Sequence, residues 1–77
     1  ELRRIIKIMQ RENVSSTNIR SIGYDSETST LEVEFLNGGT YQYFDVPESI
    51  HQGLMSAVSH GEYLAACIKG SYRYSKV

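Results

Sequence analysis

Hydrophobic and polar positions near the start of the chain repeat with the period of a helix. Across residues 2–12 the apolar side chains fall on one arc when successive residues are advanced by about 100°, and the basic side chains fall on the opposite arc. The apolar arc holds Leu2, Ile5, Ile6, Ile8 and Met9, and the basic arc holds Arg3, Arg4, Lys7 and Arg11. The pattern predicts an amphipathic helix, ended by the polar residues 15–18.

The period changes to two beyond residue 18. The runs 19–25, 30–36 and 40–46 are rich in β-branched and aromatic residues, and polar turn residues separate them. The middle run alternates most regularly, so that its apolar and acidic side chains point to opposite faces. Gly23 in the first run marks a weak point or a bulge. Together the three runs predict an antiparallel meander.

The turn Asn37-Gly38-Gly39 leaves two registers for the second and third strands. A two-residue Asn-Gly turn would pair Phe35 with Thr40, whereas a three-residue loop with Gly39 in the left-handed region would pair Phe35 with Tyr41. A slip of one residue moves every side chain to the other face, so the apolar pattern decides. We predict the three-residue loop, because it gathers on one face Leu31, Val33, Phe35, Tyr41 and Tyr43.

Helical spacing returns after Pro47, a residue favoured at the first position of a helix. Apolar residues recur through 50–58, and Ser59 followed by Glu62 matches the capping box that starts a second helix. Gly70 is typical of a left-handed C-cap, and the residues after it form either a short strand or an extended tail. We therefore predict an α+β fold with an N-terminal amphipathic helix, a three-stranded antiparallel meander and two helices on one sheet face.

The composition is that of one small soluble domain. The 77 residues are 40% hydrophobic and 22% charged, and no stretch reaches the roughly 18 apolar residues of a membrane span. One cysteine forms no internal disulfide, and no secretory signal peptide is recognisable. These features predict a reduced, cytoplasmic compartment and no membrane contact. Because the first residue is Glu1, we expect a processed product or a piece of a longer protein.

The net charge of −1 conceals an uneven distribution. Residues 1–20 carry five basic and two acidic side chains, a sum of +3, residues 21–68 carry −7, and residues 69–77 carry +3. If the two ends meet in space, their basic side chains form a patch that suits phosphate groups. Its members would be Arg3, Arg4, Lys7, Arg11, Arg20, Lys69, Arg73 and Lys76. The alternative is that the separated charges keep the domain in solution or pair with a partner protein.

Tyrosine is unusually frequent, with six residues that include the pairs Tyr41-Gln42-Tyr43 and Tyr72-Arg73-Tyr74. Alternate aromatic residues on a strand either stack single-stranded bases or fill a core. The register above favours the core for the first pair. For the second pair, which lies in the basic C-terminal segment, both interpretations stay open.

No group of residues has the spacing of a catalytic or metal site. His51, His60 and Cys67 lack the companions that zinc binding needs, so we expect surface histidines and a small buried cysteine. Glu32 and Glu34 share a strand face, and carboxylates so placed are usually solvated. We therefore predict no enzymatic activity, no cofactor and no metal.

A series of short motifs extends from residue 15 to near the end of the chain. They are Ser15-Ser16, Ile22-Gly23-Tyr24-Asp25, Leu31-Glu32-Val33-Glu34-Phe35, Tyr41-Gln42-Tyr43, Val46-Pro47, Ala57-x-Ser59-x-Gly61-x-Tyr63, Ile68-Lys69 and Tyr72. In this order they resemble the KTSC domain, a small domain at the C-terminus of some lysyl-tRNA synthetases and also a stand-alone bacterial protein. The resemblance divides the chain into a helix and linker at 1–14 and a KTSC-like domain at 15–77. Attachment to a tRNA enzyme implies RNA binding, by analogy.

We expect a non-catalytic accessory module that binds RNA or another single-stranded nucleic acid. The basic patch would hold phosphates while Tyr72 or Tyr74 stacks a base. The alternative is a module for protein interaction or oligomerisation, in which an open sheet edge accepts a strand or the apolar helix face docks on a partner. The docking residues would then be Leu2, Ile5, Ile6 and Met9.

Overall fold

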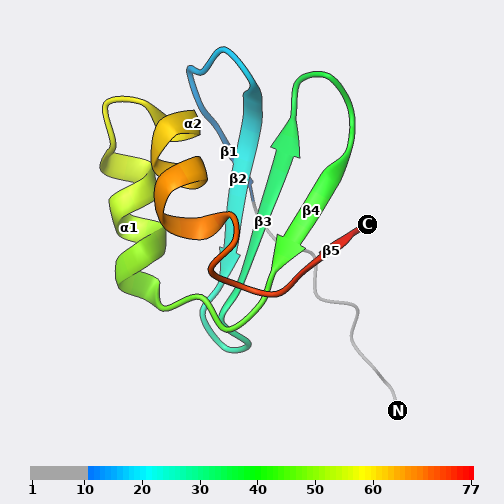
Figure 1. The fold of residues 1–77 in the computed structure, drawn as a ribbon, viewed down its shortest axis with the longest axis vertical. Helices are drawn as coiled ribbons and strands as arrows, with labels where there is room; N and C mark the ends of the chain where they lie inside the picture. Colours follow the sequence, from blue (N-terminus) through cyan, green and yellow to red (C-terminus); the bar gives the residue numbers. More distant parts are fainter. Residues whose placement is uncertain (1–10) are drawn as a thin grey trace.

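The computed structural model describes residues 11–77, which form one antiparallel sheet with a helical segment on one face (Figure 1). The strands lie in the order β1-β2-β3-β4-β5. Their bounds are β1 Arg11–Asn13, β2 Ile19–Asp25, β3 Thr30–Phe35, β4 Thr40–Tyr43 and β5 Tyr74–Lys76. The helical segment lies between β4 and β5 and consists of α1 Glu48–Ser56, α2 His60–Tyr63 and the π-helix η1 Leu64–Ile68.

The predicted α+β fold with a three-stranded meander and an N-terminal helix is wrong. The sheet has five strands, because β1 pairs with β2 at one edge and β5 pairs with β4 at the other. Residues 11 and 12, assigned to the helix by their spacing, belong to β1, where pairing with β2 overrides the local pattern. The rest of the predicted helix lies outside the described residues. The C-terminal segment forms a strand rather than an extended tail.

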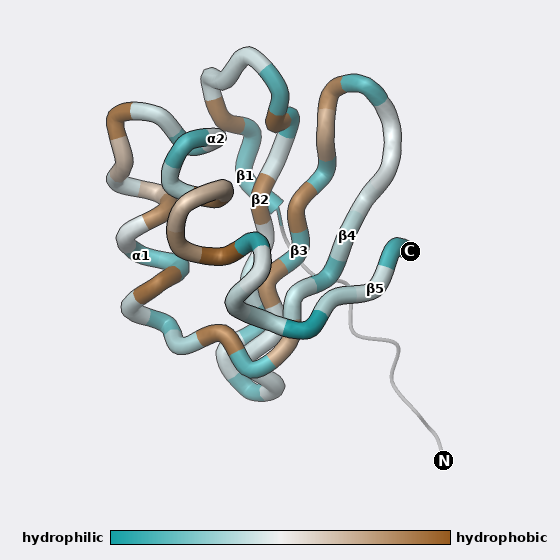
Figure 2. Tube along the Cα trace, viewed as in Figure 1, coloured by the Kyte–Doolittle hydropathy of each residue, from teal (hydrophilic) through white to brown (hydrophobic). Residues whose placement is uncertain are grey.

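The core lies between the helical segment and one face of the sheet. Buried residues of the strands and of the helices belong to one cluster, and Figure 2 shows hydrophobic positions along both the strands and the helical segment. Burial of each such side chain contributes about 1.5–3 kcal/mol to folding. The buried members are Ile19, Ile22, Leu31, Val33, Tyr43, Val46, Leu54, Leu64 and Ile68. Among residues 11–77 no helix is long and apolar enough to cross a membrane.

The β3–β4 hairpin has the predicted faces but a different register. Val33 pairs with Tyr41 and Leu31 with Tyr43, so the predicted pairs are displaced by two residues. An even displacement leaves every side chain on its predicted face. The loop begins one residue earlier than expected: Gly38 has φ of 97°, and its N–H donates to the Phe35 carbonyl over 3.2 Å. The left-handed residue that a three-residue loop requires is therefore Gly38.

The second helical stretch, α2 and η1, begins and ends at the capping residues that the sequence indicates, whereas Pro47 is the N-cap of α1 and not its first residue. The Ser59 hydroxyl accepts from the Glu62 N–H over 3.2 Å, and Gly70 follows the last helix with φ of 82°. Gly53 allows α1 to approach α2, since a Cβ on it would lie 2.1 Å from the Tyr63 hydroxyl oxygen. The segment differs from prediction at Cys67, which is exposed rather than buried.

The exposure of Cys67 follows from the π-helix. The Lys69 N–H donates to the Leu64 carbonyl five residues earlier, over 2.8 Å. A turn closed by a five-residue hydrogen bond rotates less per residue than an α-helical turn. Leu64 and Ile68 consequently both reach the core, while the residue three positions after Leu64 turns toward solvent.

Candidate nucleic-acid interface

A hollow of about 650 Å³ opens where the β3–β4 hairpin faces the end of η1 and the start of β5. We call it the aromatic groove. Four strand positions supply aromatic side chains to its wall, and Asn18, Asn37 and Lys69 supply polar side chains. The aromatic side chains are Phe35, Tyr41, Tyr43 and Tyr74. Among residues 11–77 no Asp or Glu lines this wall, so the described part of the groove presents ring faces and positive charge together.

Sheet pairing brings these rings together. Tyr43 lies opposite Tyr74 in register, and the Tyr74 ring centroid lies 5.9 Å from that of Tyr41 and 5.8 Å from that of Tyr43. Phe35 meets Tyr41 edge to face at 5.7 Å. Burial, and then the neighbouring phenols, raises the pKa of the Tyr43 phenol. Tyr74 is 61% exposed and therefore offers the most accessible ring surface of the group.

Two lysines flank the groove without an acidic partner in the described part of the chain. The Lys69 ammonium lies 5.4 Å from the centroid of the Phe35 ring. Lys76 lies opposite Tyr41 in register, and its ammonium is 3.8 Å from the position of a Cβ built on Gly39. Neither forms an ion pair with residues 11–77, whereas every described arginine does. Among the described lysines and arginines, these two are therefore the ones whose charge meets a phosphate without first leaving a carboxylate.

A second hollow of about 610 Å³ adjoins the first. Phe44, Tyr72 and Arg73 contribute to its wall, and Tyr74 and Gly70 line both hollows. The Arg73 guanidinium lies 5.5 Å from the Phe44 ring centroid and 2.9 Å from an Asp45 carboxylate oxygen. The two charged side chains are 75% and 77% exposed, so this ion pair contributes little to stability.

The structure does not bring together the predicted patch of eight basic residues. Lys69, Arg73 and Lys76 lie around the two hollows, whereas Arg11 and Arg20 lie on the opposite face of the sheet. The described ends of the chain form opposite edges of the sheet, and this separates the two groups. Arg3, Arg4 and Lys7 lie outside the described residues. Nucleic-acid binding by each predicted residue stays a prediction.

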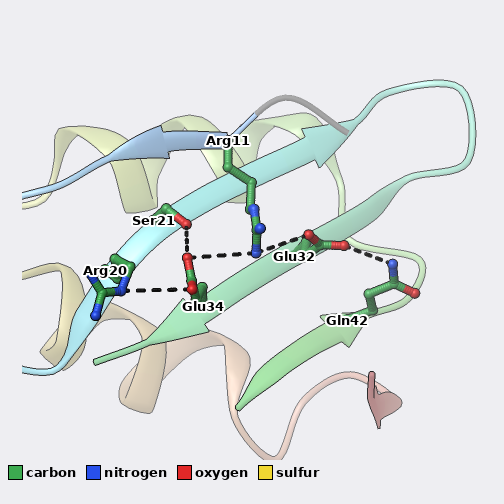
Figure 3. Close-up of polar contacts among 6 residues, drawn as sticks. All are labelled: Arg11, Arg20, Ser21, Glu32, Glu34 and Gln42. Carbon is green, nitrogen blue, oxygen red and sulfur yellow. Dashed lines mark hydrogen bonds and ion pairs between the residues drawn. The ribbon is translucent and has the colours of Figure 1, made fainter. Parts of the chain in front are cut away.

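On the polar face, two arginines share two carboxylates (Figure 3). Arg11 lies 3.2 Å from Glu32 and 3.8 Å from Glu34, and Arg20 lies 3.7 Å from Glu34. The Ser21 hydroxyl donates to Glu34 and the Gln42 amide donates to Glu32, each over 2.9 Å. We call these six residues the polar network. The network neutralises the acidic strand positions, so Glu32 and Glu34 do not stand as isolated carboxylates.

The sequence did not identify Asn18, Phe35 or Asn37 as parts of the groove wall, and it favoured the core over base stacking for Tyr41. Tyr41 packs against the core, is half-buried and also lines the groove. The available signal was the β5 sequence Tyr74-Ser75-Lys76, whose alternation matches that of Tyr41-Gln42-Tyr43. Such a match indicates strand pairing only weakly, since local propensity does not specify a non-local partner.

The histidines are half-buried rather than exposed. The His51 ring stacks on Tyr24, with centroids 4.7 Å apart and an angle of 9° between planes, and burial lowers its pKa. His60 Nδ1 lies 2.8 Å from the Leu54 carbonyl oxygen. Within residues 11–77 no three His, Cys, Asp or Glu side chains are placed to hold a metal ion.

The protein-docking hypothesis rests on residues outside the described part of the chain, namely Leu2, Ile5, Ile6 and Met9. The two sheet edges are β1 and β5, and each has three residues. Short edge strands are a common protection against pairing with another chain. Oligomerisation through the helix face or a sheet edge stays a prediction.

Comparison with known proteins identifies the family. The family model of the KTSC domain matches residues 15–72. The crystal structure of a KTSC domain protein from Yersinia pestis superposes with a TM-score of 0.88 at 50% sequence identity, over 91% of this chain and 99% of that one.

Similar sequences occur both as nearly a whole small protein and as a small part of a much longer one. A protein of Stutzerimonas stutzeri is 40% identical over 70 residues, which are 90% of this chain and 99% of that protein. A lysine–tRNA ligase of Nostoc punctiforme is 36% identical over 59 residues, which are 77% of this chain but only 10% of the ligase. The predicted resemblance is confirmed: the chain belongs to the KTSC domain family.

Proposed function

We propose that this domain is a non-catalytic accessory module that binds single-stranded RNA in the aromatic groove. The observation that carries the proposal is that accessible aromatic rings lie together with Lys69 in a wall that, among residues 11–77, contains no carboxylate, and that Lys76 lies beside this wall, opposite Tyr41. Proteins that bind single strands combine these same elements, ring faces for the bases and cations for the backbone. The occurrence of related sequence in a lysine–tRNA ligase supports RNA as the partner.

The proposed roles follow from exposure and charge. Tyr74 supplies the stacking surface, because its ring is the most exposed of the groove aromatics. Tyr41 supports that ring from the adjacent strand. Lys69 and Lys76 bind phosphates and release counterions from the strand, which makes the affinity depend on salt. Tyr43 is buried and holds the sheet beneath the site rather than contacting RNA.

Fluorescence anisotropy with a labelled single-stranded RNA of 12 nucleotides, titrated at several salt concentrations, tests the proposal. We expect binding at low salt that weakens linearly on a logarithmic scale as salt rises. The matched control is Arg20→Gln, which removes a cation from the polar network on the other face. An absence of binding at low salt, or equal loss from Lys69→Gln and Arg20→Gln, contradicts this site.

A further inference from the structure

The two hollows share part of their wall. Their shared lining residues are Gly70 and Tyr74. Gly70 has no side chain, and a Cβ on it would meet no atom within 4 Å. Tyr74 is consequently the shared wall residue that has a side chain.

Each hollow has its own aromatic surface and its own cation. Phe35 and Tyr41 line the first together with Lys69, and Phe44 and Tyr72 line the second together with Arg73. The second cation is available, because the Arg73–Asp45 pair lies in solvent on both sides and a phosphate is an equivalent bidentate acceptor for a guanidinium.

We infer that the two hollows hold two successive bases of one RNA strand, with the Tyr74 ring between them. This inference rests on the proposed function. It adds the number of bases that the site holds and the path that the strand follows beyond the first hollow. A strand that bound in the first hollow alone would leave Phe44 and Tyr72 uncovered. A strand that continues past Tyr74 brings its next base to those rings and its next phosphate to Arg73.

The experiment compares three 5′-phosphorylated probes by competition against the labelled 12-nucleotide RNA. They are an adenosine mononucleotide, the adenosine dinucleotide, and a dinucleotide of equal charge whose second position is abasic. Stacking of one base on an aromatic ring raises affinity by roughly 5- to 150-fold. We expect the dinucleotide to exceed both other probes by about tenfold, and further nucleotides to add less than about threefold through phosphate contacts alone.

Variants assign the two positions. Arg73→Gln, a substitution at an exposed side chain, reduces binding of the dinucleotide while leaving that of the mononucleotide unchanged. Phe44→Leu does the same to a larger extent, and circular dichroism confirms that this variant is folded. Lys69→Gln weakens all three probes. If Phe44→Leu does not fold, the comparison of dinucleotide with abasic probe in the unaltered protein still decides the question.

The outcomes separate the inference from the proposed function. Equal binding of the dinucleotide and the abasic probe, with retained binding of the 12-nucleotide RNA, overturns the two-base site but not RNA binding. Failure of the 12-nucleotide RNA to bind at low salt overturns both. A continued tenfold gain with each added nucleotide also overturns the inference, because it requires a longer track than the two hollows supply.

Discussion

On the polar face of the sheet, Arg11 and Arg20 lie within 3.2 to 3.8 Å of the carboxylates of Glu32 and Glu34, whereas Lys69 and Lys76 beside the aromatic groove have no acidic partner among residues 11–77. Net charge and charge runs do not distinguish these cations. The distinction is whether strand pairing places a carboxylate across from the cation. The two lysines without a carboxylate partner therefore indicate a binding site. The two arginines that pair with carboxylates indicate a structural network.

The register explains how the polar network closes. Arg11 pairs with Gly23, and Gly23 pairs in turn with Glu32 on the next strand. Because glycine has no side chain, Arg11 crosses β2 and reaches the carboxylate beyond it, as Figure 3 shows. The bulge expected at Gly23 is instead an irregularity between Ile19 and Ser21. That irregularity surrounds Arg20, which interacts with Glu34.

The largest predicted effect is on stability, and it compares the core face and the polar face of the sheet at two adjacent residues. Leu31→Ala removes a fully buried side chain from the helix-bearing side and lowers the free energy of unfolding by about 2–5 kcal/mol. Glu32→Gln, one residue later in the polar network, lowers it by roughly 1–2 kcal/mol. The glutamine keeps the volume of this 14% exposed side chain, and Arg11 keeps Glu34 as an acidic partner at 3.8 Å. Urea denaturation measures both. Equal losses would contradict the assignment of the core to one face.

A smaller effect is expected on binding when the exposed ring is removed. Tyr74→Ala weakens binding of single-stranded RNA by about 1–3 kcal/mol, the contribution of one base stacked on an aromatic ring. Tyr74→Phe keeps the ring and should keep the affinity. Anisotropy titration of both variants provides the measurement, and similar losses from the two would show that the ring does not stack a base.

The salt dependence of binding compares the two groups of cations directly. Lys69→Gln and Lys76→Gln each reduce the slope of log affinity against log salt by about 0.7, the value for one phosphate contact on a single strand. Arg11→Gln and Arg20→Gln leave the slope unchanged, because their charges serve the polar network. A slope change from the arginine variants would place RNA on the polar face.

The smallest predicted effect concerns pH and His51. Burial lowers the pKa of this imidazole in the folded protein below its ordinary value of 6.5, while Glu12 and Glu48 act in the opposite direction. The unfolded chain therefore takes up the proton more readily, and stability is lost as pH falls from about 7 through the folded pKa. Urea denaturation at pH 7.5 and pH 5 should show a stability advantage over His51→Gln that shrinks at the lower pH. A stability advantage that is larger at pH 5 than at pH 7.5 would show that folding raises the pKa of His51 and does not lower it.

The local part of the fold was predictable from the sequence, and the non-local part was not. Alternation identified β2, β3 and β4, and the capping residues Ser59 and Gly70 located the boundaries of the second helical stretch. The edge strand β1 was assigned to a helix, and β5 was left open between a short strand and a tail. Three residues carry little periodic signal, and the partner of β5 is distant in sequence. The π-helix, which exposes Cys67, has no recognised sequence pattern.

The site was predictable in the same uneven way. Lys69, Tyr74 and Lys76 were identified by residue type and charge, and they lie at or beside the groove. The sequence did not show which basic residues would acquire carboxylate partners. That pairing depends on the hairpin register, which differs by two residues from the prediction, and on β1, which was predicted as helix. It also did not show that Phe35 and Asn37 complete the wall.

The position of β5 has a consequence for the motions of the site. This strand pairs with β4 alone, and the whole helical segment separates the two in sequence, so closing that pairing carries a larger entropic cost than closing the hairpins. Opening of β5 is then a local event that leaves β2 and β3 intact. Its amide protons should exchange with solvent first, and a ligand that spans Tyr41 and Tyr74 should slow that exchange by holding β5 against β4.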